Sequence, residues 1–239
     1  MHSAGLTNKK IEALVLFDID GTLVWNFPEH KEAFCKAFKE VYHLDCSIDC
    51  INPQGMTDQR IALEVLKKNG LKEKEIKSKM SQFMQAAASF FNKIDNKNCA
   101  VVLPGVKELL DKLQQNNVVL GLVTGNLKSI AKGKLKRLEL EKYFRIGGFG
   151  SDDIERTNLV KIAIKQATIL CGYEISGDRI YVVGDTPKDI KAAKEAKIKV
   201  IAVATGQYTI KDLQRFKPDY TFRNLTPTEK IVRVILANR

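Results

Sequence analysis

The chain has 239 residues, 44% of them hydrophobic and 28% charged, which is the composition of a soluble globular protein with a substantial buried core. It contains no apolar run long enough to span a membrane and no evident secretory signal, so we expect a cytoplasmic protein. The formal net charge of +11 raises the question of an acidic partner.

Two stretches carry a local excess of Lys and Arg, residues 128–145 and 188–199. Both alternate basic with apolar residues at helical spacing, which favours solvated helix faces. The alternative that stays open is a basic rim that attracts phosphorylated substrates or nucleic acid. No zinc-finger or aromatic RNA-binding signature accompanies these stretches, so sequence-specific nucleic-acid binding is not supported.

Cysteine and histidine form no catalytic or zinc-binding pattern. The five cysteines are scattered without a CxxC motif, and we expect all of them to be reduced thiols. The three histidines are also isolated, and His30 is expected at an exposed position near a helix start. The sequence therefore does not predict a mechanism based on a histidine dyad.

The first predicted element is a buried strand over residues 13–17, where five apolar residues follow one another. The strand ends in Asp18 and Asp20, followed at once by Gly21. Two carboxylates at the carboxyl end of a strand repel each other unless a metal ion or a shared proton compensates them. An EF-hand loop also begins with Asp-x-Asp, but Leu23 occupies its glycine position, which argues against calcium.

The next segment is predicted to be entirely helical. Apolar residues recur there at helical spacing in three stretches, residues 28–44, 57–69 and 72–93. No strong strand pattern interrupts them. We therefore predict an all-helical insertion over residues 25–98, within a core domain that comprises residues 1–24 and 99–239; the family resemblance described below implies that this insertion is a cap domain.

Strands and helices alternate after the cap. The predicted strands are residues 118–123, 179–183 and 200–203, with an apolar segment at 144–149. The predicted helices are residues 106–115, 127–138, 157–170 and 188–196, with one more near the C-terminus. Such alternation is typical of βαβ units. We predict an α/β fold, a Rossmann-like parallel sheet with helices on both faces, plus the inserted all-helical cap.

Further polar side chains follow the predicted strands. Thr124 directly follows the strand predicted at residues 118–123, and Asp185 and Asp189 follow the strand predicted at residues 179–183. Parallel strands bring these residues to the same carboxyl edge as Asp18. Together with Asp20, the carboxylates can bind a hard divalent cation, for which Mg²⁺ is well suited. A threonine hydroxyl and backbone N–H groups at a strand-to-helix turn can hold phosphate oxygens.

Three ordered motifs resemble those of the haloacid dehalogenase-like hydrolase superfamily: FDIDGT (17–22), LVTGN (122–126) and GDTPKD (184–189). The segments at 103–113 and 204–220 resemble the family's return from cap to core and its closing segment. Within the superfamily, the chain is most similar to the phosphoglycolate phosphatase and β-phosphoglucomutase type, which carries a helical cap. The resemblance covers essentially the whole chain.

The resemblance implies roles for the acidic residues. Asp18 is expected to be the nucleophile that forms an aspartyl-phosphate. Asp20 is expected to be the general acid for the leaving alcohol and then the base that activates water. The side chains of Asp18 and Asp185, with the backbone carbonyl of Asp20, would bind Mg²⁺. Asp189 would support the metal shell or orient the cationic residue.

The resemblance also implies a phosphate site and a cation. Thr124 and the backbone of Gly125 and Asn126 would hold the transferring phosphoryl group. The third motif departs from the family, because its usual Lys-Pro is absent from residues 148–167. Two candidates for the phosphate-neutralising cation remain: Arg156 at the expected helix start, which we favour, and Lys161 one turn further on.

The second carboxylate, Asp20, indicates phosphoryl transfer rather than dehalogenation. We predict a Mg²⁺-dependent phosphatase, similar to phosphoglycolate phosphatase, that hydrolyses a small phosphomonoester through an aspartyl-phosphate intermediate. A phosphosugar mutase of the same family is the alternative, and a non-catalytic binding module that uses the basic surface is the alternative of another class. Arg60 in the cap is a candidate for binding a substrate anion. The expected partner is a small phosphorylated metabolite, and the expected protein is a monomer or homodimer.

Overall fold

The computed structural model describes residues 11–94 and 99–237. Six parallel strands form its central sheet, in the order β5-β4-β1-β6-β7-β8. The strands are β1 (Ala13–Phe17), β4 (Val118–Thr124), β5 (Ile146–Phe149), β6 (Ile180–Gly184), β7 (Lys199–Val203) and β8 (Tyr220–Phe222). Strand β1 lies between β4 and β6, so its carboxyl end is flanked by theirs.

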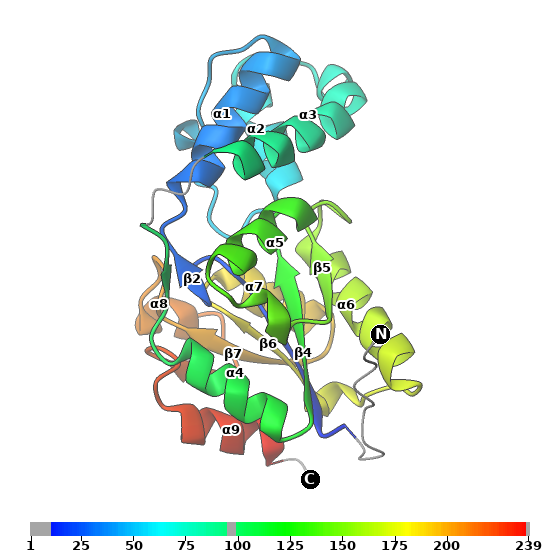
Figure 1. The fold of residues 1–239 in the computed structure, drawn as a ribbon, viewed down its shortest axis with the longest axis vertical. Helices are drawn as coiled ribbons and strands as arrows, with labels where there is room; N and C mark the ends of the chain where they lie inside the picture. Colours follow the sequence, from blue (N-terminus) through cyan, green and yellow to red (C-terminus); the bar gives the residue numbers. More distant parts are fainter. Residues whose placement is uncertain (1–10, 95–98, 238–239) are drawn as a thin grey trace.

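Helices cover both faces of this sheet. One face packs against α4 (Val106–Gln115), α5 (Lys128–Arg137) and α9 (Thr228–Leu236), and the other against α6 (Arg156–Cys171), α7 (Pro187–Glu195) and α8 (Ile210–Gln214). Val15 and Phe17 of β1 face the first group, whereas Leu14 and Leu16 face the second, because side chains alternate along a strand. The predicted α/β fold is confirmed (Figure 1).

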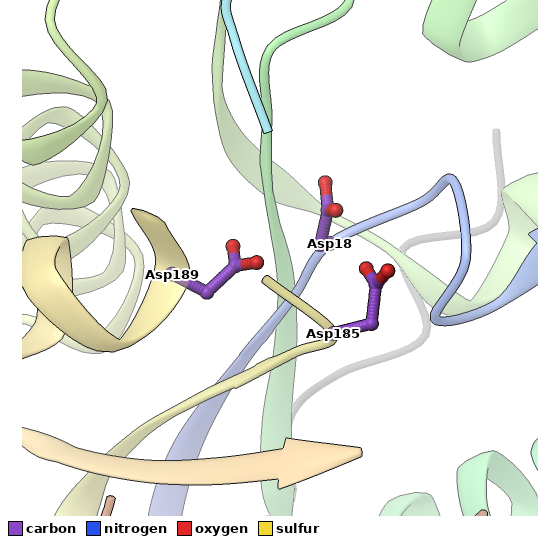
Figure 2. A group of neighbouring side chains, drawn as sticks. All are labelled: Asp18, Asp185 and Asp189. Atoms are coloured by element: carbon purple, nitrogen blue, oxygen red, sulfur yellow. The ribbon is translucent and has the colours of Figure 1, made fainter. Parts of the chain in front are cut away.

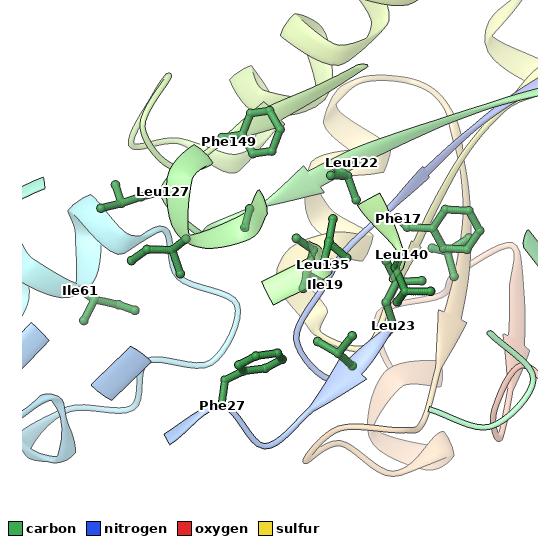
Figure 3. Close-up of a cluster of buried hydrophobic side chains, with 14 of the residues drawn as sticks. Phe17, Ile19, Leu23, Phe27, Ile61, Leu122, Leu127, Leu135, Leu140 and Phe149 are labelled. Carbon is green, nitrogen blue, oxygen red and sulfur yellow. The ribbon is translucent and has the colours of Figure 1, made fainter. Parts of the chain in front are cut away.

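Three further helices lie together beyond the carboxyl edge of the sheet (Figure 1). They are α1 (Pro28–Tyr42), α2 (Asp58–Lys68) and α3 (Glu73–Lys93), with the short 3-10 helix η1 (Ile48–Cys50) between the first two. Their shared core is aromatic: the rings of Phe38 and Phe83 stack with centroids 4.8 Å apart, and Phe34 meets Phe83 edge-on. Figure 3 shows how Phe27 and Ile61 extend the apolar cluster of the sheet toward these helices.

Two short strands join the helical part to the sheet. Strand β2 (Val24–Trp25) pairs in antiparallel fashion with β3 (Val101–Val102), so the outgoing and returning chain lie side by side. Two single-turn 3-10 helices, η2 (Glu141–Tyr143) and η3 (Gly177–Arg179), precede β5 and β6. The sequence did not predict these elements, because two or three residues are too few to show a hydrophobic period.

The five cysteines are free thiols in the structure, as predicted. Among the described residues, none of the helices combines the length and the apolar character needed to cross a membrane.

Candidate active site

Three buried carboxylates meet where β1 and β6 end. Asp18 follows β1, Asp185 follows β6, and Asp189 lies in the first turn of α7. One oxygen from each lies within 4.8 Å of the other two, and all three residues are buried. Figure 2 shows them around one point at the carboxyl edge of the sheet. The predicted convergence of these residues is therefore present in the fold.

Glycines make room for this cluster. Gly21 has a φ of +78°, and a Cβ on it would lie 2.4 Å from a carboxylate oxygen of Asp185. A Cβ on Gly206 would lie 1.8 Å from the same oxygen. The Asp185 carboxylate also accepts a hydrogen bond from the Thr22 hydroxyl at 3.2 Å. The backbone on two sides thus approaches the carboxylate as closely as only glycine permits.

Burial and mutual repulsion disfavour the charged forms of these carboxyl groups. Burial raises the pKa of Asp18 to about 7, although the Arg156 guanidinium acts to lower it. Burial, with repulsion from Asp18 and Asp189, raises the pKa of Asp185 to about 8. Carboxylates that are driven toward protonation in this way lack sufficient positive charge around them.

Arg156 is the cation nearest to Asp18 among the described contacts. It is the first residue of α6, is 8% exposed, and places Nη2 2.8 Å from an oxygen of Asp18 and 2.5 Å from an oxygen of Asp189. The same nitrogen donates to the carbonyl of Val123 at 3.2 Å. Its Nε is buried and has no hydrogen-bond partner among the described residues, so it can donate to a bound ligand. Lys161 is exposed on the same helix.

Asp20 lies in a separate environment two residues after Asp18. Both of its carboxylate oxygens lie 2.7 Å from Nζ of Lys134, and one also accepts a hydrogen bond from Nδ2 of Asn126 at 2.7 Å. Burial acts to raise the pKa of Asp20, but the Lys134 ammonium, together with the hydrogen bonds from Lys134 and Asn126, holds it below its ordinary value. The site therefore keeps Asp20 as a carboxylate.

A row of hydrogen bonds links Asp20 to the helical part of the molecule. Nζ of Lys134 lies 3.0 Å from Nδ1 of His30 on α1, and Nε2 of His30 lies 3.2 Å from a carboxylate oxygen of Asp58 on α2. That oxygen also accepts from the backbone N–H of Leu127 at 2.7 Å. His30 is thus half-buried in the site, and the expectation that it is exposed was wrong, because α1 packs its first turn against the sheet edge.

The loop after β4 lies beside Asp20 and contains the predicted phosphate-binding residues. The Thr124 hydroxyl is fully buried and accepts from the backbone N–H of Asn126 at 3.2 Å. Gly125 passes so close to the cap that a Cβ on it would lie 2.2 Å from the carbonyl oxygen of Met56. The structure thus brings Thr124, Gly125 and Asn126 to the edge that carries the aspartates.

These groups surround a cavity of about 210 Å³ between the sheet edge and the helices above it. Its core side comprises Asp18, Asp20, Gly125, Asn126, Lys134, Arg156 and Thr186. Its other side comprises residues of the linker, α1, η1 and α2, most of them apolar. Arg60 does not line this cavity. Its side chain pairs with Glu155 and borders a second hollow of about 170 Å³ near Lys188.

Three residues of the cavity wall were not predicted as site residues from the sequence: Lys134, His30 and Asp58. Lys134 belongs to a stretch that was interpreted as a solvated helix face, yet it is 1% exposed. Its position gave a signal, because it falls between Ala131 and Leu135 in the apolar stripe of α5. His30 and Asp58 gave none, since each contacts residues more than twenty positions away.

Ionised groups of both signs at the carboxyl edge of a Rossmann-like sheet, enclosed by a layer of helices, are typical of the active site of an α/β enzyme. A family model described as haloacid dehalogenase-like hydrolase matches residues 15–203. The chain belongs to the haloacid dehalogenase-like hydrolase family, in agreement with the resemblance of its motifs.

Its relatives include named phosphatases. The chain is 26% identical over 223 residues to phosphoglycolate phosphatase 1 of Pseudomonas aeruginosa, a match that covers 90% of this chain and 78% of the relative. Solved structures share the fold. A predicted phosphoglycolate phosphatase of Haemophilus somnus superimposes with a TM-score of 0.67 at 23% identity, covering 95% of this chain and 100% of that one. A proposed β-phosphoglucomutase of Bacteroides vulgatus gives 0.66 at 24% identity, covering 95% and 90%.

Proposed function

We propose that this chain is a Mg²⁺-dependent phosphatase that hydrolyses a small phosphomonoester through an aspartyl-phosphate on Asp18. The observation that carries the proposal is the pairing of Asp18 with Arg156 at 2.8 Å in a cavity that also contains Asp20. A buried guanidinium beside a nucleophilic carboxylate can neutralise the phosphoryl oxygens as the new bond forms. The named phosphatases among the relatives support the same reaction.

The two aspartates perform different parts of this reaction. An oxygen of Asp18 attacks phosphorus and the bond from phosphorus to the leaving oxygen breaks. Because the site favours the carboxylate of Asp20, this residue first takes a proton from solvent and then passes it to the leaving oxygen. Water then attacks the phosphorus of the aspartyl-phosphate while Asp20 takes its proton, and Asp18 and inorganic phosphate are released. The contacts with Lys134 and Asn126 favour the carboxylate form of Asp20, which is the form that the second half-reaction needs.

The phosphoryl group has donors on several sides. We assign its contacts to the Arg156 guanidinium and the loop of Gly125 and Asn126, which line the cavity together with Asp18, and to Thr124 at the end of β4. Asn126 holds Asp20 through Nδ2. These groups orient the substrate and oppose the charge of the transferring phosphoryl group.

The cluster of carboxylate oxygens is suited to bind a divalent cation. Three buried carboxylates share one guanidinium, and the raised pKa values of Asp18 and Asp185 indicate that more positive charge is needed. We assign the Mg²⁺ ligands to these two side chains and the backbone carbonyl of Asp20, with Asp189 orienting Arg156. Bound Mg²⁺ would supply the missing charge and polarise the phosphoryl oxygens.

Residues 25–98 act as the cap in this proposal. They supply the part of the cavity wall that the leaving group meets, and β2 and β3 provide the paired connection on which such a cap can move. The reaction needs neither a membrane nor a nucleic acid. The hydrolysis of a small cellular metabolite is consistent with a cytoplasmic enzyme.

The test replaces the nucleophile without changing its shape. Asp18→Asn should reduce the hydrolysis of an aryl phosphate in the presence of Mg²⁺ by at least about 10³-fold, since the amide cannot attack phosphorus. Asp45→Asn, which alters a carboxylate with a 90% exposed side chain, is the matched control and should retain full activity. Phosphate release by the Asp18 variant at the native rate would refute the proposal.

A phosphosugar mutase is the second candidate, favoured by the fold that the chain shares with the Bacteroides protein. The two reactions diverge after the aspartyl-phosphate forms. A phosphatase transfers the phosphoryl group to water, whereas a mutase returns it to a second sugar hydroxyl. Stoichiometric release of inorganic phosphate from a hexose phosphate, without an isomeric hexose phosphate, would favour the phosphatase.

A further inference from the structure

One buried acidic side chain faces the cap side of the cavity among mostly apolar neighbours. Asp58, at the start of α2, lines the cavity and is 2% exposed. Its neighbours in this part of the wall are predominantly apolar: Phe27, Phe34, Ile48, Pro53, Met56 and Ile61. A carboxylate in an apolar wall contributes a negative potential to this side of the cavity, the side that we assign to the leaving group of a phosphomonoester.

Asp58 is fixed in this position by the core. Its backbone N–H donates to the carbonyl of Gly125 at 2.7 Å, and one of its carboxylate oxygens accepts from the N–H of Leu127 at 2.7 Å. Both partners belong to the segment that follows Thr124. The carboxylate therefore lies directly beside the loop that follows β4.

Lys134 and His30, basic groups of the described cavity wall, are already engaged. Lys134 directs its ammonium to both oxygens of Asp20. An ammonium group only donates hydrogen bonds, so Nδ1 of His30 accepts from Lys134 and its Nε2 carries the hydrogen that Asp58 accepts. Neither ring nitrogen of His30 remains to bind an anionic substrate group.

The remaining cations of the described wall are also paired. Arg156 binds Asp18 and Asp189 at the phosphoryl end of the cavity. Lys31 lies at the cap end, where it pairs with Asp49, and about half of its side chain is exposed. The cap end thus contains one buried carboxylate and no unpaired cation among the described lining residues.

We propose that the substrate is a phosphomonoester whose leaving alcohol carries no second anionic group, being uncharged or cationic. This inference rests on the proposed phosphatase function and sharpens it. A carboxylate or a second phosphate on the leaving group would approach Asp58 without a cation to compensate it. An alkyl group gains contact with the apolar wall, and an ammonium group gains an attractive interaction with Asp58.

The test compares three phosphomonoesters of similar size and different charge. They are 2-phosphoglycolate, whose leaving group carries a carboxylate, isobutyl phosphate, whose leaving group has a similar shape and no charge, and O-phosphoethanolamine, whose leaving group carries an ammonium. Each is measured as a substrate with Mg²⁺ at pH 7 and as a competitor of aryl phosphate hydrolysis, so that a compound that binds without turnover is also ranked. We expect 2-phosphoglycolate to bind and react at least about tenfold more weakly than the other two.

Two variants separate the role of Asp58 from other effects. Asp58→Asn keeps the shape and a hydrogen-bond acceptor but removes the charge, and it should reduce the discrimination against 2-phosphoglycolate at least about threefold. The ratio between two compounds is measured on one protein, so a partial loss of folded enzyme does not affect it. Lys31→Met is the control and should leave the order of the three compounds unchanged.

The outcomes distinguish this inference from the function on which it rests. If the native protein prefers 2-phosphoglycolate to isobutyl phosphate, or if that order depends on Lys31, the inference is wrong although the chain is a phosphatase. An unchanged ratio in Asp58→Asn would also overturn it. If no compound, the aryl phosphate included, releases phosphate, the phosphatase function itself fails.

Discussion

Two ion pairs lie next to each other at the carboxyl edge of the sheet, Arg156 with Asp18 and Lys134 with Asp20. Each cation is at least nine-tenths buried. Removing one member of such a pair leaves an uncompensated charge, which is far less favourable than leaving both or removing both. The two aspartates have different partners, although only one residue separates them in the chain, and this difference supports the different roles that we propose for them.

A substitution of Lys134 tests whether its ion pair with Asp20 contributes to catalysis. Lys134→Met should lower kcat for aryl phosphate hydrolysis by about 10²-fold, the order that general acid-base catalysis contributes, because Asp20 loses the contacts that orient it. KM should change little, since Lys134 acts on Asp20 and leaves the phosphoryl-binding groups intact. The measurement is a steady-state comparison of kcat and KM.

The matched control is Lys132→Met, two positions earlier on α5, where the side chain is 57% exposed. It should keep the native kcat. A Lys134 variant with the same melting temperature and native kcat would show that the ion pair has no part in the reaction.

The start of α2 is attached to the core by hydrogen bonds from three successive residues. Thr57 donates to Ile154 from its hydroxyl, Asp58 donates from its backbone N–H, and Gln59 donates to the carbonyl of Gly150 at 2.7 Å. The loops that receive them follow β4 and β5. One helix end thus connects the helical part to two loops of the core, of which the loop after β4 is the one that we propose to bind the phosphoryl group.

A substitution of Gly150 tests the contact between the start of α2 and the loops that follow β4 and β5. An added Cβ would lie 1.9 Å from the carbonyl oxygen of Gly125 and 3.3 Å from the backbone nitrogen of Asp58. Gly150→Ala should therefore separate the loops and the cap, raising KM about tenfold and lowering stability by about 1–3 kcal/mol, the usual effect of overpacking. Enzyme kinetics and denaturant unfolding measure the two effects.

Gly177→Ala serves for comparison, because the nearest atom to its added Cβ is 3.1 Å away, in Lys197, far from the cap. It should have native KM. Equal KM values for both glycine variants would mean that the seam between α2 and the core has no role in substrate binding.

The elements themselves were largely predictable. Continuous apolar runs gave the buried strands β1, β4 and β6, since a parallel sheet covered on both faces leaves no polar side on a strand. Their order in the sheet places Asp18, Thr124 and Asp185 together, as their common position at strand ends indicated.

The contacts around Asp20 were not predictable in the same way. They join residues separated by 104 and 114 positions, and no local period records that Lys134 of the core and His30 of the helical part meet at this site. A lysine in an apolar helical stripe is a usable signal for a buried cation. Its partner becomes known only when the tertiary structure is known.

For the molecule as a whole, the acidic cluster links metal binding to stability. Mg²⁺ that binds only the folded state should stabilise it by ~2.7 kcal/mol at a hundredfold excess over Kd. A chain of this size gains roughly 2–4 °C in Tm per kcal/mol, so the expected shift is several degrees. Thermal unfolding with Mg²⁺ and with a chelator measures the difference.

Asp185→Asn should raise the Tm of the metal-free protein and weaken its stabilisation by Mg²⁺. With a chelator present, the variant should melt above the native protein, because it lacks one of three mutually repelling buried carboxylates. Addition of Mg²⁺ should then shift its Tm far less. An equal Mg²⁺ shift in the variant and the native protein would place the cation elsewhere.

The row formed by Asp20, Lys134, His30 and Asp58 crosses from core to cap, with two members on each side. This division constrains how the protein can be recombined. A chimera that takes its cap from a relative keeps the pair of Lys134 with Asp20, because both belong to the core. It keeps the rest of the row only if the donor cap brings a histidine and an aspartate to the places of His30 and Asp58, so that the cap and the core exchange as a matched set.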